Sequence, residues 1–257
     1  MTTALILSGG VSHPFAETTD AIVQILLAVG ADVDVIFEPE DLVDLDHDLL
    51  VVNALWWQML GDNYDDGREE FGRSISQPAR VAVEAHVEAG GSILAMHTAS
   101  ICFDDWPEWG DIVGARWVWG RSMHPVLDPE HTVEIKVDDR HEITDGLADF
   151  NVIDEVYGFM DIAPDAQVLA TSSHGGVAHP MLLAHQFGRS AVVYDALGHD
   201  LRSVNHPVHH RILVRSIGWL LSHTTPDLVR TMEAEGLDLD GTSENAAMNG
   251  TSEQDVE

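Results

Sequence analysis

The chain contains very little cysteine and very little lysine. Cys102 is the only cysteine, which excludes an internal disulfide and a cysteine-rich zinc site. Lys136 is the only lysine, and 12 basic side chains face 44 acidic ones, so the formal net charge is -32. Because phosphate groups are repelled by such a charge, we expect neither nucleic acid nor a membrane surface as a partner.

Long apolar runs are also missing. None approaches the ~18 residues that a membrane-spanning helix needs, and Met1 to Thr3 carries no basic segment ahead of an apolar core. A lone thiol fits a reducing compartment. These features together predict a soluble cytoplasmic protein.

The acidic excess extends through the hydrophobic, periodic part of the chain and is not confined to its end. Repulsion on this scale loosens a compact domain in dilute buffer, but it is screened at ~1 M salt, where the Debye length is ~3 Å. The composition therefore predicts a halophilic protein. An ordinary acidic protein with an acidic tail is the alternative.

Length and composition predict one folded domain followed by a tail. The 257 residues are enough for one well-buried α/β domain, and 45% of them are hydrophobic. We place the domain at residues 1–225. Residues 226–257 are acidic and polar with few apolar side chains, so we expect that segment to be disordered.

Short apolar segments alternate with amphipathic ones. The pattern predicts strands at residues 4–7, 33–37, 49–52, 92–96, 132–137, 167–171, 181–184 and 190–194, and helices at residues 18–29, 78–89 and 207–221. Strands alternating with helices are typical of parallel βαβ units. In the last helix, His206, His209 and His210 lie near the start, where we expect solvated or capping roles.

Two histidines follow predicted strands directly. His97 ends the segment SILAM, and His199 follows the apolar run 190–194 by a few residues. Parallel strands present their carboxyl ends at one edge of the sheet, where open α/β proteins bind their ligands. We therefore expect both imidazoles in one crevice, facing solvent.

Four segments carry a family resemblance. They are GSILAMHT at 91–98, WVWGRSMHP at 117–125, RHEITDGLADFNVIDEVYGF at 140–159, and the strand with ALGHD and NHP at 190–207. In this order they resemble the ThuA-like family, named for a trehalose-utilisation protein, over roughly residues 1–222. The resemblance implies a flavodoxin-like, class I glutamine amidotransferase-like α/β fold, a three-layer sandwich with a mainly parallel central sheet. It also suggests a role in sugar or disaccharide utilisation.

The chain departs from the amidotransferases at the nucleophile. Those enzymes carry a cysteine at the turn after the strand, where this sequence has His97 to Ser100, and Cys102 lies about one helical turn too late. His199 and Asp200 match their catalytic histidine and glutamate. Glutamine hydrolysis by a thiolate is therefore not expected, and Ser100 is a weak substitute because it lacks a neighbouring base.

The motif positions that offer nitrogen and oxygen donors are His97, His124, Glu155 and His199. We predict that these four are catalytic, acting by general acid/base chemistry or as ligands of a divalent ion such as zinc. None has the close spacing of a metal motif. The structural alternatives are that His97 caps the following helix, that His124 is a turn residue, and that Glu155 pairs with an arginine.

Four further residues are candidates for substrate binding: His13, Tyr157, Asp200 and Trp57. His13 follows a tight turn at Gly9 and Gly10, which lack the spacing of a phosphate loop. An indole such as that of Trp57 can stack on a sugar, although packing is the expected role for most of the tryptophans.

Two functional classes stay open. The first is an enzyme acting on a sugar or an oxidised sugar through a His/Glu site, of hydrolase, lyase or isomerase type. The second is a catalytically silent amidotransferase-like domain that binds a sugar or a partner protein. Homo-oligomerisation is compatible with both classes. A site confined to buried salt bridges would favour the second class.

The charge predicts a salt dependence. Lowering KCl from molar concentration to about 0.1 M should reduce the melting temperature, because the Debye length rises to ~10 Å and acidic groups repel one another over longer distances. Thermal unfolding in a KCl series measures this. An unchanged melting temperature across the series would contradict the halophile prediction.

Overall fold

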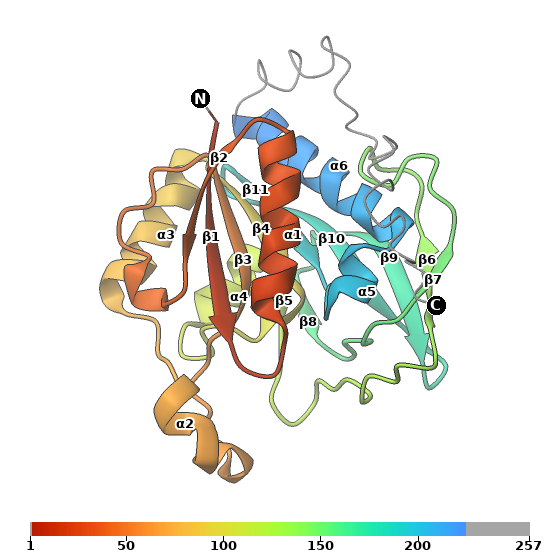
Figure 1. Ribbon diagram of the computed structural model, residues 1–257, viewed down its shortest axis with the longest axis horizontal. Coiled ribbons are helices and arrows are strands. Elements are labelled where there is room, and N and C mark those ends of the chain that lie inside the picture. The colour runs from red at the N-terminus through yellow and green to blue at the C-terminus, as the bar shows by residue number, and fades with distance from the viewer. Residues whose placement is uncertain (1, 225–257) are drawn as a thin grey trace, which may run out of the picture.

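Five parallel strands form one half of a nine-stranded sheet in the computed structural model, which describes residues 2–224 (Figure 1). Their order, β2-β1-β3-β4-β11, is the flavodoxin order. The bounds are β1 Thr3–Gly10, β2 Asp32–Ile36, β3 Leu49–Leu55, β4 Ser92–Met96 and β11 Ser190–Asp195. The predicted parallel core is confirmed. The predicted tail at 226–257 lies outside the described residues.

Buried apolar side chains explain why these segments form strands. All seven residues of β3 and all five of β4 are buried, as expected for strands covered on both faces. Asn53 of β3 donates to the hydroxyls of Thr18 and Thr19 on the first helix. These bonds satisfy a buried amide and fix the start of that helix against the sheet.

The other half of the sheet is antiparallel, so the prediction of a mainly parallel sheet holds only for its core. Strands β10 (Val177–Phe187), β9 (Gln167–His174), β6 (Val133–Val137) and β7 (Phe150–Val152) continue beside β11. The cause is local: Gly175 and Gly176, both at positive φ, join β9 and β10 in a tight hairpin. Strands β5 (Ala115–Arg116) and β8 (Asp161–Ile162) form a separate pair.

Helices lie on both faces of the sheet. Figure 1 shows α1 (Phe15–Ala28), α5 (Leu201–Val204) and α6 (Pro207–Thr224) in front of it and α3 (Gln77–Ala89) behind it. Helix α3 begins where the Ser76 hydroxyl accepts a bond from Ala79 N, and it ends at left-handed Gly90. Helices α2 (Asp65–Phe71) and α4 (Pro107–Val113) and the short 3-10 turns η1 (Pro39–Asp41), η2 (Asp62–Tyr64) and η3 (His97–Ser100) complete the elements.

The three predicted helices are confirmed as α1, α3 and α6, with ends shifted by a few residues. No helix within residues 2–224 is both long enough and apolar enough to cross a membrane.

A buried ion pair joins the end of β11 to α6. Asp195 Oδ2 lies 3.0 Å from His209 Nε2, and His209 Nδ1 donates to the carbonyl oxygen of Ser203 at 2.9 Å. The expectation that His209 is solvated or capping is wrong, because its side chain is completely buried. Both ring nitrogens face acceptors, which favours the imidazolium. Burial lowers the pKa of His209, but the Asp195 charge outweighs burial and raises it.

Replacing His209 by Gln should therefore destabilise the protein by about 3–5 kcal/mol at pH 6, because a buried carboxylate loses its cation. The pKa in the folded state lies above the unfolded value of ~6.5, so the stabilisation is complete below pH ~6.5 and is lost as pH rises through the folded pKa. Denaturant unfolding of both proteins at pH 6 and pH 9 measures the difference. A difference that stays constant or grows with pH would contradict the ion pair.

Candidate functional site

His97 lies at the sharp turn that follows β4. Its φ is 43°, in the left-handed region that non-glycine residues seldom adopt. The ring does not cap η3, because its Nδ1 donates to the carbonyl oxygen of Ala196 at 2.6 Å. The capping alternative is therefore wrong. The bond leaves Nε2 facing Tyr157 and Glu155, at a strand-to-turn junction of the kind that carries reactive side chains in α/β enzymes.

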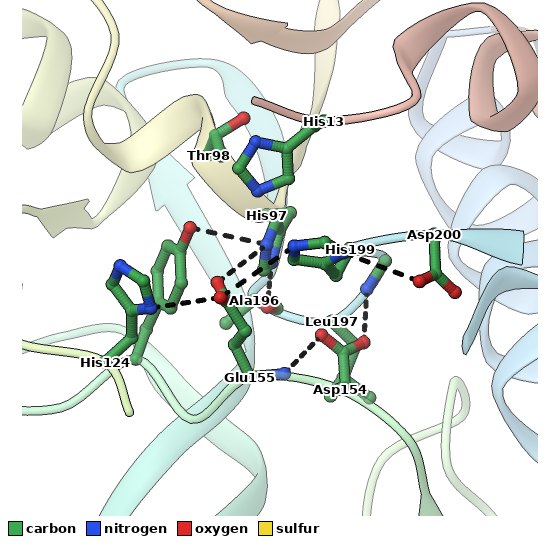
Figure 2. A network of polar contacts seen from close by, with 12 residues as sticks. His13, His97, Thr98, His124, Asp154, Glu155, Ala196, Leu197, His199 and Asp200 are labelled. Carbon is green, nitrogen blue, oxygen red and sulfur yellow. Dashed lines mark hydrogen bonds and ion pairs between the residues drawn. The ribbon is translucent and has the colours of Figure 1, made fainter. Parts of the chain in front are cut away.

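The Glu155 carboxylate lies at the centre of three imidazoles. Its Oε1 is 3.0 Å from His124 Nδ1 and 3.8 Å from His199 Nε2, and its Oε2 is 3.5 Å from His97 Nε2. Figure 2 shows the carboxylate between His124 and His199. The structure thus brings together all four residues that the sequence predicted to be catalytic. The arginine alternative for Glu155 is wrong, since its ionic partners within residues 2–224 are histidines.

The four side chains differ in access to solvent. Those of His97 and Glu155 are 2% and 6% exposed, whereas those of His199 and His124 are 16% and 41% exposed. The expectation that His97 faces solvent is wrong, because Ala196 and Tyr157 cover it. His124 and His199 are therefore the groups that a bound molecule reaches most directly.

The histidines also differ in the direction of their pKa shifts. The hydrogen bond that His124 donates to the Glu155 carboxylate raises the pKa of His124. Burial and the neighbouring His97 lower the pKa of His199. Burial also opposes protonation of His97, but the carboxylates of Glu155 and Asp154 outweigh it and raise the pKa. Burial would raise the pKa of Glu155, and the nearby imidazoles of His124 and His97 instead hold it well below its usual range.

His13 closes the site from the β1 edge. Its ring centroid lies 5.1 Å from that of His97 and 4.5 Å from that of His199. Burial and these two imidazoles lower the pKa of His13 to about 3. The loop reaches this place because β1 ends at Gly10, where a Cβ would lie 2.4 Å from the Leu55 carbonyl oxygen. Only glycine allows that approach.

The other predicted substrate-binding residues are placed differently. The buried Tyr157 hydroxyl lies 3.3 Å from His97 Nε2, within the site. Asp200 begins α5 by accepting a bond from Arg202 N and pairs with the Arg202 side chain, so its role is at least partly structural. Trp57 lies outside the cluster, against Tyr64 in a separate pocket.

Backbone hydrogen bonds bring His124 and Tyr157 together. Met123 and Gly158 exchange hydrogen bonds of 3.1 and 2.7 Å, which places His124 beside Tyr157 with ring centroids 5.6 Å apart. These residues come from two irregular segments of the chain. The motif resemblance, not periodicity, was the signal that could have found them.

Asp154 is a positioning residue that the sequence did not reveal. One of its oxygens accepts from Glu155 N and the other from Gly198 N, both at 2.7 Å. The bonds tie the loop of Glu155 to the loop of His199 (Figure 2). Asp195 holds the same loop from below by accepting from Leu197 N at 3.0 Å. The sequence signal that could have indicated these positioning residues is an acidic residue at or just after the end of a strand.

Cys102 is buried and hydrogen-bonded to the backbone. Its thiol donates to the carbonyl oxygen of Ala54 at 3.1 Å, and burial raises its pKa to about 12. A thiol that stays protonated at neutral pH is a poor nucleophile. Ser100 is also buried, and its hydroxyl is paired with that of Tyr194 at 2.9 Å. Both observations agree with the predicted absence of a nucleophilic elbow.

Comparisons with known proteins bear on these observations. No curated protein matches the chain. A ThuA-like protein from Parabacteroides merdae is 19% identical with a TM-score of 0.66, covering 85% of this chain and 89% of that one. A ThuA-like protein from Bacteroides uniformis is 16% identical with a TM-score of 0.65, covering 88% and 93%. A β-galactosidase from the haloarchaeon Halorubrum lacusprofundi is 13% identical with a TM-score of 0.53, over 86% of this chain and 30% of that one.

These structural likenesses show a shared fold. The family assignment comes from the sequence, because the model of the family described as "ThuA: Trehalose utilisation" matches residues 3–220, which include every member of the His/Glu cluster. The resemblance seen in the motifs is thereby confirmed, and the chain belongs to the ThuA family.

Proposed function

We propose that this chain is an enzyme of carbohydrate utilisation that acts on a sugar or an oxidised sugar of the trehalose class by proton transfer. The proposal assigns proton transfer to His124 and His199, which lie on either side of Glu155 and are open to solvent. His97 and Glu155 are buried and hold the centre together. The observation that carries it is the convergence of these four side chains in a ThuA-family protein.

The carboxylates limit the type of reaction. Glycosidases commonly use two carboxyl groups that flank the scissile bond. Here both oxygens of Asp154 accept backbone N–H groups, and Asp200, 3.6 Å from His199 Nδ1, is paired with Arg202, so Glu155 is the carboxylate of the cluster whose ionic partners are all imidazoles. One free carboxylate among imidazoles fits the removal and return of a proton, as in a lyase or isomerase acting beside a carbonyl group. An oxidised sugar supplies such a carbonyl.

Aromatic side chains support a sugar as the ligand. Ring contacts run from Tyr157 to Trp117 at 5.3 Å, on to Trp119 at 6.3 Å, to Tyr64 at 6.4 Å and to Trp57 at 5.5 Å. The far end lines a pocket of about 400 Å³, within the size range of small-molecule sites. The Trp57 indole Nε1 is buried without a hydrogen-bond partner in residues 2–224 and can donate to a sugar hydroxyl.

The alternative is a silent domain that binds a sugar or a protein. Such a domain has no need for an accessible His/Glu cluster, and buried salt bridges alone would have favoured it. The exposure of His124 favours the enzyme. We further propose a halophilic, cytoplasmic protein on a three-layer, amidotransferase-like frame, because the acidic excess and the strand order support that setting.

Replacing His199 by Asn should lower turnover by about 10²–10⁴-fold, the usual range for a lost acid/base group, with little change in melting temperature. Trehalose, related disaccharides and their oxidised forms would be incubated with the protein, and products followed by NMR. The Cys102→Ala variant is the matched control and should stay active. An inactive Cys102 variant together with an active His199 variant would support a thiol mechanism and contradict this proposal.

Replacing Trp119 by Ala should raise KM about 2- to 10-fold and leave kcat nearly unchanged, because loss of one ring contact costs about 0.5–1.5 kcal/mol of binding. Its side chain is 48% exposed, so folding should be preserved. Val126→Ala, at a 90% exposed position outside the aromatic row, is the control. Equal KM values for the three proteins would exclude the aromatic pocket from sugar binding.

A further inference from the structure

Three buried polar atoms of the site have no hydrogen-bond partner among residues 2–224. One is His199 Nδ1, which lies 3.6 Å from the Asp200 carboxylate, and the other two face the centre of the site. These two are His13 Nε2 and Glu155 Oε2. Buried polar atoms are nearly always satisfied, so each unsatisfied one calls for an explanation. Both atoms belong to side chains of a single group, His13, His97 and Glu155, whose donor atoms all lie within 4.8 Å of one another.

The two imidazoles are oriented alike. His97 Nδ1 donates to the Ala196 carbonyl oxygen at 2.6 Å, and His13 Nδ1 lies 3.3 Å from the Val11 carbonyl oxygen, which can only accept. In both rings the proton is therefore placed on Nδ1, so that each Nε2 offers a lone pair; the Nε2 of His97 also lies 3.3 Å from the Tyr157 hydroxyl. Histidines that bind metal ions are usually held in this way, with the outer N–H on a carbonyl or carboxylate.

We infer that His13, His97 and Glu155 bind a divalent transition metal ion of the zinc type, with one coordination position open. Two imidazoles and one carboxylate form the ligand set of several catalytic zinc sites. The donors suit zinc better than magnesium or calcium, which prefer oxygen ligands. Glu155 Oε2 and His97 Nε2 are 3.5 Å apart, close to the ~3.3 Å between two ligands at ~2.0–2.1 Å from a tetrahedral ion.

The geometry divides Glu155 between two tasks. Its Oε1 faces His124 and His199, whereas its Oε2 faces His97 and carries the unsatisfied lone pairs (Figure 2). Of the four ligands that the sequence predicted, His97 and Glu155 belong to the three-residue group, and His13 replaces the other two. His124 and His199 remain free to transfer protons.

A bound ion would also explain how the centre tolerates its charge. Glu155 is buried beside the buried carboxylate of Asp154, and a buried anion needs a cation or several donors close by. A protonated His97 could balance Glu155 without metal. That arrangement leaves His13 Nε2 unsatisfied, whereas a metal ion satisfies both atoms. An ion in this position can polarise a sugar carbonyl or hydroxyl group.

Zinc binding can be measured on the whole chain without any sugar. Protein free of an affinity tag would be treated with a chelator, dialysed into molar KCl to screen the acidic surface, and titrated with Zn²⁺ by calorimetry. The expected result is one equivalent per chain. Glu155→Gln and His13→Asn should each weaken binding by at least the ~10–100-fold seen when an outer partner of a metal ligand is lost. His131→Asn is the matched control, because His131 forms an exposed pair with Asp128.

Melting curves would establish that the variants fold. If Glu155→Gln fails to fold, the His13→Asn variant still provides the test, because His13 lies in a loop. No zinc binding by the wild-type chain would overturn the inference. Equal binding by wild type and both variants would also overturn it and would assign the zinc to surface carboxylates. Inactivity on every sugar with zinc binding intact would instead count against the proposed function alone.

Discussion

The site is organised around the buried carboxylate of Glu155. An isolated anion in a protein interior is costly, and here imidazoles offset only part of the cost: His124 and His199 face Oε1 and His97 faces Oε2, which has no hydrogen-bond partner among residues 2–224. Its hydrogen bond with His124 raises the pKa of that imidazole, whereas burial and the neighbouring His97 lower the pKa of His199, which lies 3.8 Å from the carboxylate. Each histidine therefore depends on Glu155 for its position or its protonation.

The fold brings these side chains together from distant parts of the chain. Parallel strands β1, β4 and β11 deliver His13, His97 and His199 to one edge of the sheet. The loops are then held by buried acids: Asp154 joins the Glu155 and Gly198 segments. Backbone amides occupy both oxygens of Asp154, whereas the neighbouring Glu155 faces the imidazoles.

Much of the fold and of the candidate site was predictable from the sequence. The features that could not be predicted depend on contacts that a sequence pattern does not specify. His97 and His199 follow apolar strands, so their meeting at one edge could be predicted from topology, and His124 and Glu155 came from the family motifs. The antiparallel half contains short turns such as that at Gly175 and Gly176, and a strand pattern alone does not indicate direction. The sequence also could not distinguish Asp154 from Glu155, or assign His13 to the centre, because both depend on side-chain direction in irregular loops. His209 was misjudged because its carboxylate partner Asp195 lies 14 residues away.

Anomalous diffraction at the zinc absorption edge, from crystals of the tag-free chain grown with zinc, tests the account most directly. If Glu155 organises a metal-assisted site, a single strong peak should lie within about 2.0–2.2 Å of His13 Nε2, His97 Nε2 and a Glu155 oxygen, with His124 and His199 outside that distance. Crystals in which zinc is found only on surface carboxylates, with Glu155 satisfied by imidazoles alone, would contradict the account.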